Sequence, residues 1–189
     1  MTIGEISNQI KKTHLKHKPI IIAVEGFGGS GKSTFATKLK DELGNAYVVE
    51  VDDFFLKDVK SDATKSNFDR KRLKQQVLLP ARNGQPIAYQ KLEWDTNSLS
   101  KSVKVPQVSF IIIEGVSSFH PSIVGYMDYK IWLEVPGEVA KERMIKRDMT
   151  FGDDHGELWG HWTKTYQDYK DLYHPEELAD FIFDNSRKL

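Results

Sequence analysis

The chain has 189 residues, in which 27 basic side chains balance 27 acidic ones, and it contains no cysteine. A neutral balance gives no general positive field for a nucleic-acid backbone, and the missing cysteines exclude disulfides, zinc–thiolate sites and thiol catalysis. No apolar run reaches the length of a membrane span, and the residues up to Lys18 lack the apolar core of a secretion signal. The composition therefore predicts a cytoplasmic globular protein that acts on neither nucleic acid nor membrane.

Apolar, strand-like runs alternate with helical patterns along the chain. The expected strands are residues 20–25, 46–51, 108–113, 129–135 and 180–183. The expected helices are residues 2–16, 32–43, 69–79, 137–149 and about 157–173. This alternation predicts a parallel sheet covered by helices on both faces, in a single domain spanning residues 1–189. Ligands of such sheets bind beyond the carboxyl ends of the strands, so the residues after each strand are the first candidates for a site.

Residues 84–107 interrupt this alternation with a polar stretch that carries two prolines. Its partly alternating pattern predicts a small hairpin-like insertion, which we expect on the substrate side of the domain. Tyr89 and Trp94 within it either pack on the domain or are exposed for stacking.

The first strand leads directly into the glycine-rich stretch GFGGSGKST. Its spacing, Gly26-x-x-x-x-Gly31-Lys32-Ser33, is the phosphate-binding P-loop pattern. Backbone N–H groups can crowd around a triphosphate only where no Cβ intervenes and positive φ is allowed, and the following helix adds the positive end of its dipole. The residues expected to bind ATP are Gly26, Gly28, Gly29, Ser30, Gly31, Lys32, Ser33 and Thr34.

Two side chains of this stretch have expected roles of their own. Lys32 would reach the β- and γ-phosphates, and the Ser33 hydroxyl would hold Mg²⁺. The apolar strand before the loop and the helix after it are the context that the motif requires. The sequence therefore predicts an α/β P-loop NTPase fold, a three-layer sandwich with a central parallel sheet and a lid helix region.

The second strand ends in the sequence VEVDDFFLK. Asp52 and Asp53 should emerge at the same edge of the sheet as the P-loop, where carboxylates can hold Mg²⁺ or take a proton from an attacking hydroxyl. The alternative is a turn or helix-capping pair, because aspartate is common in both. We favour the functional interpretation, because this pair follows a strand beside a P-loop.

The strand at 108–113 ends in FIIIEG, an acidic residue after four apolar ones. This is the form of the second P-loop NTPase motif, whose carboxylate contacts the metal directly or through water. Glu114 is therefore the expected partner of Ser33 in a magnesium site.

The helix at 137–149 places Arg143 and Arg147 four residues apart on one face. The two arginines could close over the triphosphate as part of a lid at 143–157 and stabilise charge that develops during transfer. An ordinary solvated face with glutamate partners explains the same pattern equally well.

Several of these motifs occur in one order: GFGGSGKST, VDDFF, NFD at 67–69, IIIEGV and WLEVPGEVAKERMIKRD. Together they resemble the uridine kinase-like family of P-loop nucleoside kinases, which is related to phosphoribulokinase and nicotinamide riboside kinase. The resemblance covers about residues 19–183. The P-loop is specific only to the superfamily, whereas the DDFF and EGV pair narrows the resemblance to this family.

The resemblance implies roles for individual residues on the substrate side. Asp52 matches the aspartate that acts as general base on a ribose 5′-hydroxyl, and Phe55 matches an aromatic residue beside the nucleobase. Asp69 falls where an acidic residue holds the ribose hydroxyls. Tyr89 and Trp94 look like the region lining the base pocket, and Arg143 and Arg147 look like lid arginines. Trp162, Tyr166 and Tyr169 resemble the aromatic stretch before the last strand.

The sequence departs from the family pattern at two places. The histidine–proline pair that usually follows the FD element is replaced by DRKRL, and KLEWDTNSL lacks the usual histidine near the base pocket. The pattern EG…GSGKST, which begins at Glu25, also resembles thymidylate kinases, although the DDFF segment argues against that family. The identity of the acceptor therefore stays open, as does the choice of ATP or GTP as donor.

We expect an ATP- and Mg²⁺-dependent kinase that phosphorylates the hydroxyl of a small metabolite, with a nucleoside as the first acceptor to consider. Nicotinamide riboside, pantothenate and nucleoside monophosphates are alternative acceptors. A nucleotide-dependent switch is disfavoured, because the sequence has no Asn-Lys-x-Asp guanine reader. A non-catalytic ATP-binding regulator remains the other alternative. The sequence is compatible with a homo-oligomer but does not determine one.

Overall fold

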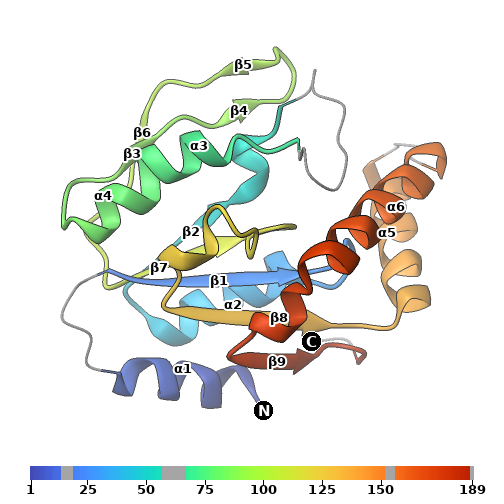
Figure 1. Ribbon diagram of the computed structural model, residues 1–189, viewed down its shortest axis with the longest axis horizontal. Helices are drawn as coiled ribbons and strands as arrows, with labels where there is room; N and C mark the ends of the chain where they lie inside the picture. The colour runs from blue at the N-terminus through green and yellow to red at the C-terminus, as the bar shows by residue number, and fades with distance from the viewer. Residues whose placement is uncertain (14–18, 57–66, 152–155, 188–189) are drawn as a thin grey trace.

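Five parallel strands form the centre of the protein (Figure 1). The computed structural model describes residues 1–13, 19–56, 67–151 and 156–187. Across the sheet the strands follow the order β2 (Ala46–Glu50), β7 (Phe110–Glu114), β1 (Ile20–Gly26), β8 (Tyr129–Glu134) and β9 (Phe181–Asp184). All four neighbouring pairs are parallel, as the alternating sequence pattern predicts. The α/β P-loop sandwich expected from the sequence is therefore confirmed.

Successive side chains of the inner strands point to opposite faces, because side chains alternate along a strand. On one face, Ile22, Val24 and Ile112 pack against the helices α1 (Ile3–Lys12) and α2 (Lys32–Leu43). On the other face, Ile21 and Ile113 belong to a cluster that also includes residues of α3 (Arg70–Leu73) and α6 (Gly156–Tyr173). Both faces are covered, which explains why the strands read as continuous apolar runs.

The helix expected at 69–79 is a continuous helical segment from Arg70 to Arg82, interrupted by a π turn. It consists of α3, the π-helical η2 (Lys74–Leu78) and α4 (Leu79–Arg82). Asp69 begins the segment by accepting a hydrogen bond from the Arg72 backbone N–H at 2.9 Å. A side chain that caps a first turn satisfies one backbone donor which the helix leaves without a partner.

Two short antiparallel ladders follow this helical segment. The outer ladder pairs β3 (Ala88–Tyr89) with β6 (Val103–Lys104), and the inner one pairs β4 (Leu92–Glu93) with β5 (Ser98–Leu99). In Figure 1 they extend beyond α3 and α4, away from the central sheet. The ladders lie within the segment at 84–107 that interrupts the βα pattern of the sequence.

The remaining helices complete the two flanking layers. The helix α5 (Gly137–Phe151) follows β8, and both α5 and α6 stand beyond the carboxyl ends of the strands in Figure 1. The 3₁₀ helices are η1 (Val51–Phe54), η3 (Val124–Tyr126) and η4 (Pro175–Leu178). Within the described residues, none of the helices combines the length and the apolar character needed to cross a membrane.

Candidate active site

The P-loop runs from the end of β1 into the first turn of α2, and it is tightly enclosed by protein. A Cβ on Gly26 would lie 2.6 Å from the Leu133 carbonyl oxygen. Gly29 has a φ of 78°, and a Cβ there would collide with the Ala140 carbonyl of α5. The sequence GFGGSGKST therefore needs these glycines for the loop to fit beneath α5, and the same absence of side chains leaves the backbone N–H groups accessible.

Lys32 occupies the centre of the site. Its side chain is buried, and Nζ donates a hydrogen bond to the Phe27 carbonyl at 3.0 Å. Burial lowers the pKa of this ammonium, while the charges of Glu114, Asp52 and Glu25 act in the opposite direction. Three carboxyl groups from two strands and the η1 turn thus surround the one lysine that the motif requires.

Glu114 lies at the carboxyl end of β7, in register with Val24 of β1 and Glu50 of β2. The side chain is buried, and burial raises the pKa of its carboxyl to about 7; the charges of Asp52 and Glu50 act in the same direction. Lys32 and a hydrogen bond with the Ser33 hydroxyl partly oppose this rise. The structure therefore brings together the serine and the glutamate that the sequence predicts as a magnesium pair.

The aspartates of the η1 turn have different surroundings. Asp53 is buried: Oδ2 accepts from the Tyr89 hydroxyl at 3.2 Å and pairs with Lys91 Nζ at 3.0 Å. The Asp52 side chain is exposed to solvent. Desolvation by the surrounding protein raises the pKa of the Asp52 carboxyl, and the charge of Asp53 acts in the same direction. The charges of Lys32 and Arg147 lower this pKa. Asp52 is therefore the member of the pair whose side chain forms no hydrogen bond or ion pair with the described residues, and the charges of Lys32 and Arg147 act on it.

The expected substrate-side residues separate into two groups. Phe55 stacks on Trp94 of the inner ladder, with ring centroids 5.3 Å apart and an angle of 30°. Tyr89 is fully buried and stacks on Phe54, so it lies beneath the site and holds Asp53 instead of lining a pocket. Asp69 caps α3 and pairs with Arg72, which engages both of its oxygens.

The arginines of α5 also differ in their contacts. Arg143 donates to the Asn185 carbonyl at 2.9 Å and so fastens α5 to the segment after β9. Arg147 pairs with the neighbouring Asp148, and its charge acts on both Lys32 and Asp52. Residues 152–155 of the expected lid lie outside the described residues.

Three buried or half-buried polar residues near this site were not given roles by the sequence analysis. Glu25 accepts hydrogen bonds from the Phe119 N–H at 2.5 Å and the Tyr169 hydroxyl at 3.3 Å, and burial raises the pKa of its carboxyl to about 7. Arg70 and His120 are half-buried and lie close enough together for the charge of Arg70 to act on the imidazole. Glu25 could have been found as an acidic residue inside an apolar strand, whereas a lone histidine after a predicted strand gives no such signal.

The residues present fit a magnesium ion bound together with a nucleotide. Among the described residues, no group of three or more His, Asp or Glu side chains could hold a metal by itself. Mg²⁺ in nucleotide sites takes one or two protein oxygens and completes its shell with phosphates and water. Ser33 and Glu114, whose side chains are within hydrogen-bonding distance of each other, would supply that protein part.

Comparisons with known proteins agree with this arrangement. Residues 2–146 match the family model described as the KAP family P-loop domain. A uridine kinase of Clostridium perfringens is 29% identical over 146 residues, covering 70% of this chain and 69% of the relative. A phosphoribulokinase of Synechocystis is 28% identical over 142 residues, covering 69% of this chain and 42% of the relative. The solved structure of a possible uridine kinase from Bacillus stearothermophilus superposes with a TM-score of 0.74 at 18% identity, covering 96% and 97% of the two chains.

The fold and the glycine loop define a P-loop NTPase of the α/β class. The chain belongs to the KAP family of P-loop domains, because the family model matches well over half of it. The resemblance to uridine kinase-like proteins that the motifs indicate is confirmed by the relatives with that name.

Proposed function

We propose that this protein is an ATP-dependent small-molecule kinase, which transfers the γ-phosphoryl group of ATP to a hydroxyl of its acceptor. The observation that carries the proposal is the buried Lys32, surrounded by Asp52 and Glu114 at the carboxyl edge of the sheet. Phosphoryl transfer depends mainly on positioning and on electrostatic stabilisation. A phosphate-binding lysine between a carboxylate for the acceptor and a carboxylate for the metal meets both needs.

Each side chain of the site has a role in this proposal. The backbone amides of the P-loop and Lys32 hold the phosphates, and Ser33 and Glu114 hold Mg²⁺, which when bound neutralises phosphate charge. Asp52 orients the acceptor hydroxyl and accepts its proton while the new oxygen–phosphorus bond forms and the bond to ADP breaks. Arg147, whose charge already acts on Lys32 and Asp52, stabilises charge on the transferred group together with Arg143.

A nucleoside with a free 5′-hydroxyl is the first acceptor to test. Relatives named uridine kinase support this choice. The stacked Phe55 and Trp94 offer flat apolar surface beside the η1 turn, where an aromatic base could bind. Asp69 would reach the ribose hydroxyls only if its hydrogen bonds within α3 were exchanged for bonds to the sugar.

A second group of acceptors consists of other small metabolites with a hydroxyl or phosphate acceptor, such as nicotinamide riboside, pantothenate and nucleoside monophosphates. One observation favours the anionic members: Arg70 follows Asp69 where the uridine kinase-like pattern has a histidine–proline pair. The remaining alternative is an ATP-binding regulator without turnover.

A coupled assay of ADP release tests these possibilities. The purified protein is incubated with Mg·ATP and each acceptor in turn, with a sample lacking acceptor as the baseline. Acceptor-dependent ADP release supports the kinase, and mass spectrometry of the product identifies the phosphorylated atom. Stoichiometric ATP binding with no release for any acceptor would contradict the kinase and favour the regulator.

A further inference from the structure

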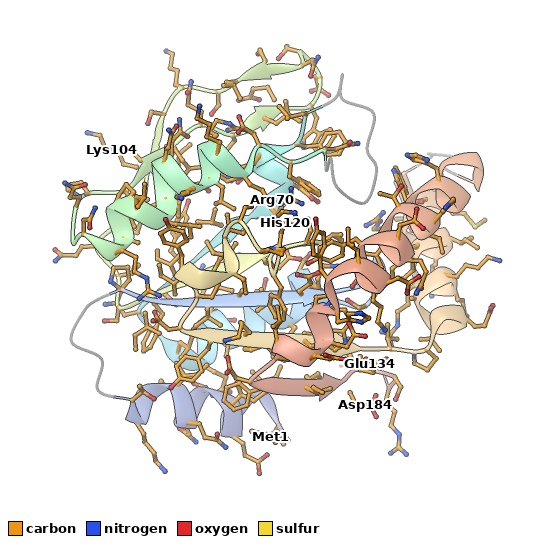
Figure 2. All side chains as sticks on the ribbon, in the orientation of Figure 1. Met1, Arg70, Lys104, His120, Glu134 and Asp184 are labelled. Carbon is orange, nitrogen blue, oxygen red and sulfur yellow. The ribbon has the colours of Figure 1, made fainter. Side chains whose placement is uncertain are left out.

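Beside the proposed site, a group of polar side chains has atoms that form no hydrogen bond within the part of the chain that the structure describes. It consists of Arg70 at the start of α3, His120 in the turn after β7, and the rings of α6 around them. Arg70 lies close enough to His120 for its charge to lower the pKa of the imidazole. Figure 2 labels the two side chains next to each other, between α3 and the central sheet. The proposal above gives neither residue a contact with ATP or with the acceptor, and it uses only the position of Arg70 in the sequence.

Arg70 is a half-buried cation on which the charge of the buried Glu25 acts. One terminal nitrogen donates to Ser117 Oγ at 3.2 Å, whereas the buried Nε has no hydrogen-bond partner among the described residues. Within residues 67–151 and the other described ranges, no carboxylate forms an ion pair with it. A guanidinium partly removed from water is costly unless a partner compensates, and its N–H groups match the paired oxygens of a carboxylate or phosphate.

His120 presents a second donor without a partner. The backbone N–H of Ser122 donates to His120 Nδ1 at 3.2 Å, so Nδ1 is an acceptor and the proton of the neutral ring lies on Nε2. Nε2 is buried, and no residue in the described part of the chain forms a hydrogen bond with it. The ring stacks on Tyr169 at an angle of 12° and meets Tyr173 edge-on, so both tyrosines fix its orientation.

The loop after β7, which carries Ser117 and His120, packs against the turn that holds the proposed base. A Cβ on Gly115 would lie 2.5 Å from the Val51 side chain, directly before Asp52. Ser117, the partner of Arg70, has a φ of 61°, which is uncommon for a residue with a side chain. Such conformations persist where the surrounding structure enforces them, and they cluster at ligand sites. Arg70 and Asp52 are therefore connected through one short, tightly packed loop.

The geometry points to an acceptor-binding site in which Arg70 and His120 bind an anionic group of the acceptor, either a carboxylate or a phosphate. Two unpartnered donors on a cation and a neutral imidazole form a site that oxygens of an anion would satisfy. This inference rests on the kinase function proposed above and narrows its acceptors. It favours pantothenate and nucleoside monophosphates over neutral nucleosides, which would bring Arg70 no negative charge beyond that of the nearby Glu25.

Comparison of three acceptors tests this site: uridine as the neutral one, uridine monophosphate with a phosphate, and pantothenate with a carboxylate. We expect turnover with one of the two anions to exceed that with uridine. In Arg70→Gln, kcat/KM for that anion should fall about 30- to 300-fold, the effect of losing charge-assisted hydrogen bonds. His120→Ala should reduce it about 10-fold. Lys71→Gln removes an exposed positive charge from the same helix and should stay within about threefold of wild type.

Thermal shift with a non-hydrolysable ATP analogue and magnesium supplies a readout without turnover, because a ligand of the folded state raises Tm. The anionic acceptor should raise Tm in wild type and Lys71→Gln but not in Arg70→Gln, whose shift with the ATP analogue alone should be unchanged. A wild type that prefers uridine, or an Arg70→Gln variant that retains the response to anions, would overturn the inference. Absence of ADP release with every acceptor would contradict the proposed kinase activity instead. In that case an anion-induced Tm shift that depends on Arg70 would still support the anion site. Absence of that shift would overturn the anion site as well.

Discussion

The donor side and the acceptor side of the site are built in different ways. The donor side lies in one contiguous stretch, GFGGSGKST, which β1, β8 and α5 enclose so closely that a Cβ would not fit at Gly26 or Gly29. The acceptor side is assembled from the η1 turn, α3, the loop after β7, the short ladders and α6. Phosphates are bound by backbone groups that any chain can supply, whereas an acceptor is distinguished by side chains. Donor binding can therefore be recognised from sequence alone, while acceptor choice requires the fold.

The largest effect is expected at Asp52, which lies where the donor side and the acceptor side of the proposed site meet. Asp52→Asn removes the proton acceptor but keeps the size of the side chain. We expect kcat to fall by about 10²–10⁴-fold while binding of ATP is retained, because general base catalysis contributes about that much. Steady-state kinetics and titration with an ATP analogue measure the two quantities. Asp53→Asn serves as the contrast, since that carboxylate pairs with Lys91. An Asp52→Asn enzyme within tenfold of wild type would exclude Asp52 as the base.

Lys32 tests the donor side alone. Lys32→Met keeps the aliphatic length of the side chain and removes the charge, and we expect kcat/KM for ATP to fall about 10²–10³-fold. The exposed Lys38 and Lys40 of α2 offer matched controls, which should stay within about threefold of wild type. A similar loss in Lys38→Met would mean that general charge, and not the lysine of the loop, accounts for the effect.

Glu25 lies between the two sides and gives the fold a dependence on pH. Its pKa is raised to about 7, so the folded state holds the proton more tightly than the unfolded chain does. Its contribution to stability is complete below about pH 4.5 and is lost as the pH rises through about 7. Glu25→Gln should therefore reduce the loss of unfolding free energy between pH 5 and pH 8 by about 2–3 kcal/mol.

Urea denaturation at both pH values measures this change, with the exposed Glu42→Gln as the control. Glu114 has a carboxyl with a similarly raised pKa and stays in the variant, so part of the pH dependence should remain. A variant with the full pH dependence of wild type would show that Glu25 is not the titrating group.

The smallest effect is expected at Lys91, which connects the ladders to the base turn through Asp53. Lys91→Met should lower kcat about 10-fold and leave KM for ATP unchanged, because only the acceptor side loses a support. Lys104→Met on β6 removes an exposed charge from the same ladders and should have no effect. An equal fall in both variants would assign the effect to the overall charge of the ladders.

The sequence predicts most of the scaffold and the donor side. The five main strands occur within two residues of their expected bounds, because buried parallel strands read as apolar runs and the P-loop fixes the first βα unit. The strand order could not be derived in this way. In the sheet, β7 lies between β1 and β2, although residues 27–109 separate β1 from β7 in the chain.

The acceptor side was less accessible to sequence reasoning. Tyr89 was expected to line the pocket, but a tyrosine on a two-residue strand can point inwards or outwards, and here it points inwards to Asp53. Asp69 reads equally as a sugar ligand and as a helix cap, and the structure gives it the capping bonds. Arg70 and His120 are fifty residues apart in the chain, and only the packing of α3 against the loop after β7 brings them together.

One contact at the edge of the sheet has a practical consequence. The Asn185 side chain donates to the Ser30 carbonyl at 2.7 Å, and the backbone carbonyl of Asn185 accepts from Arg143. A single asparagine after the last strand thus connects the P-loop to α5. Replacing Asn185 would therefore release the P-loop from the segment that Arg143 fastens to α5, although Asn185 itself has no proposed role in catalysis.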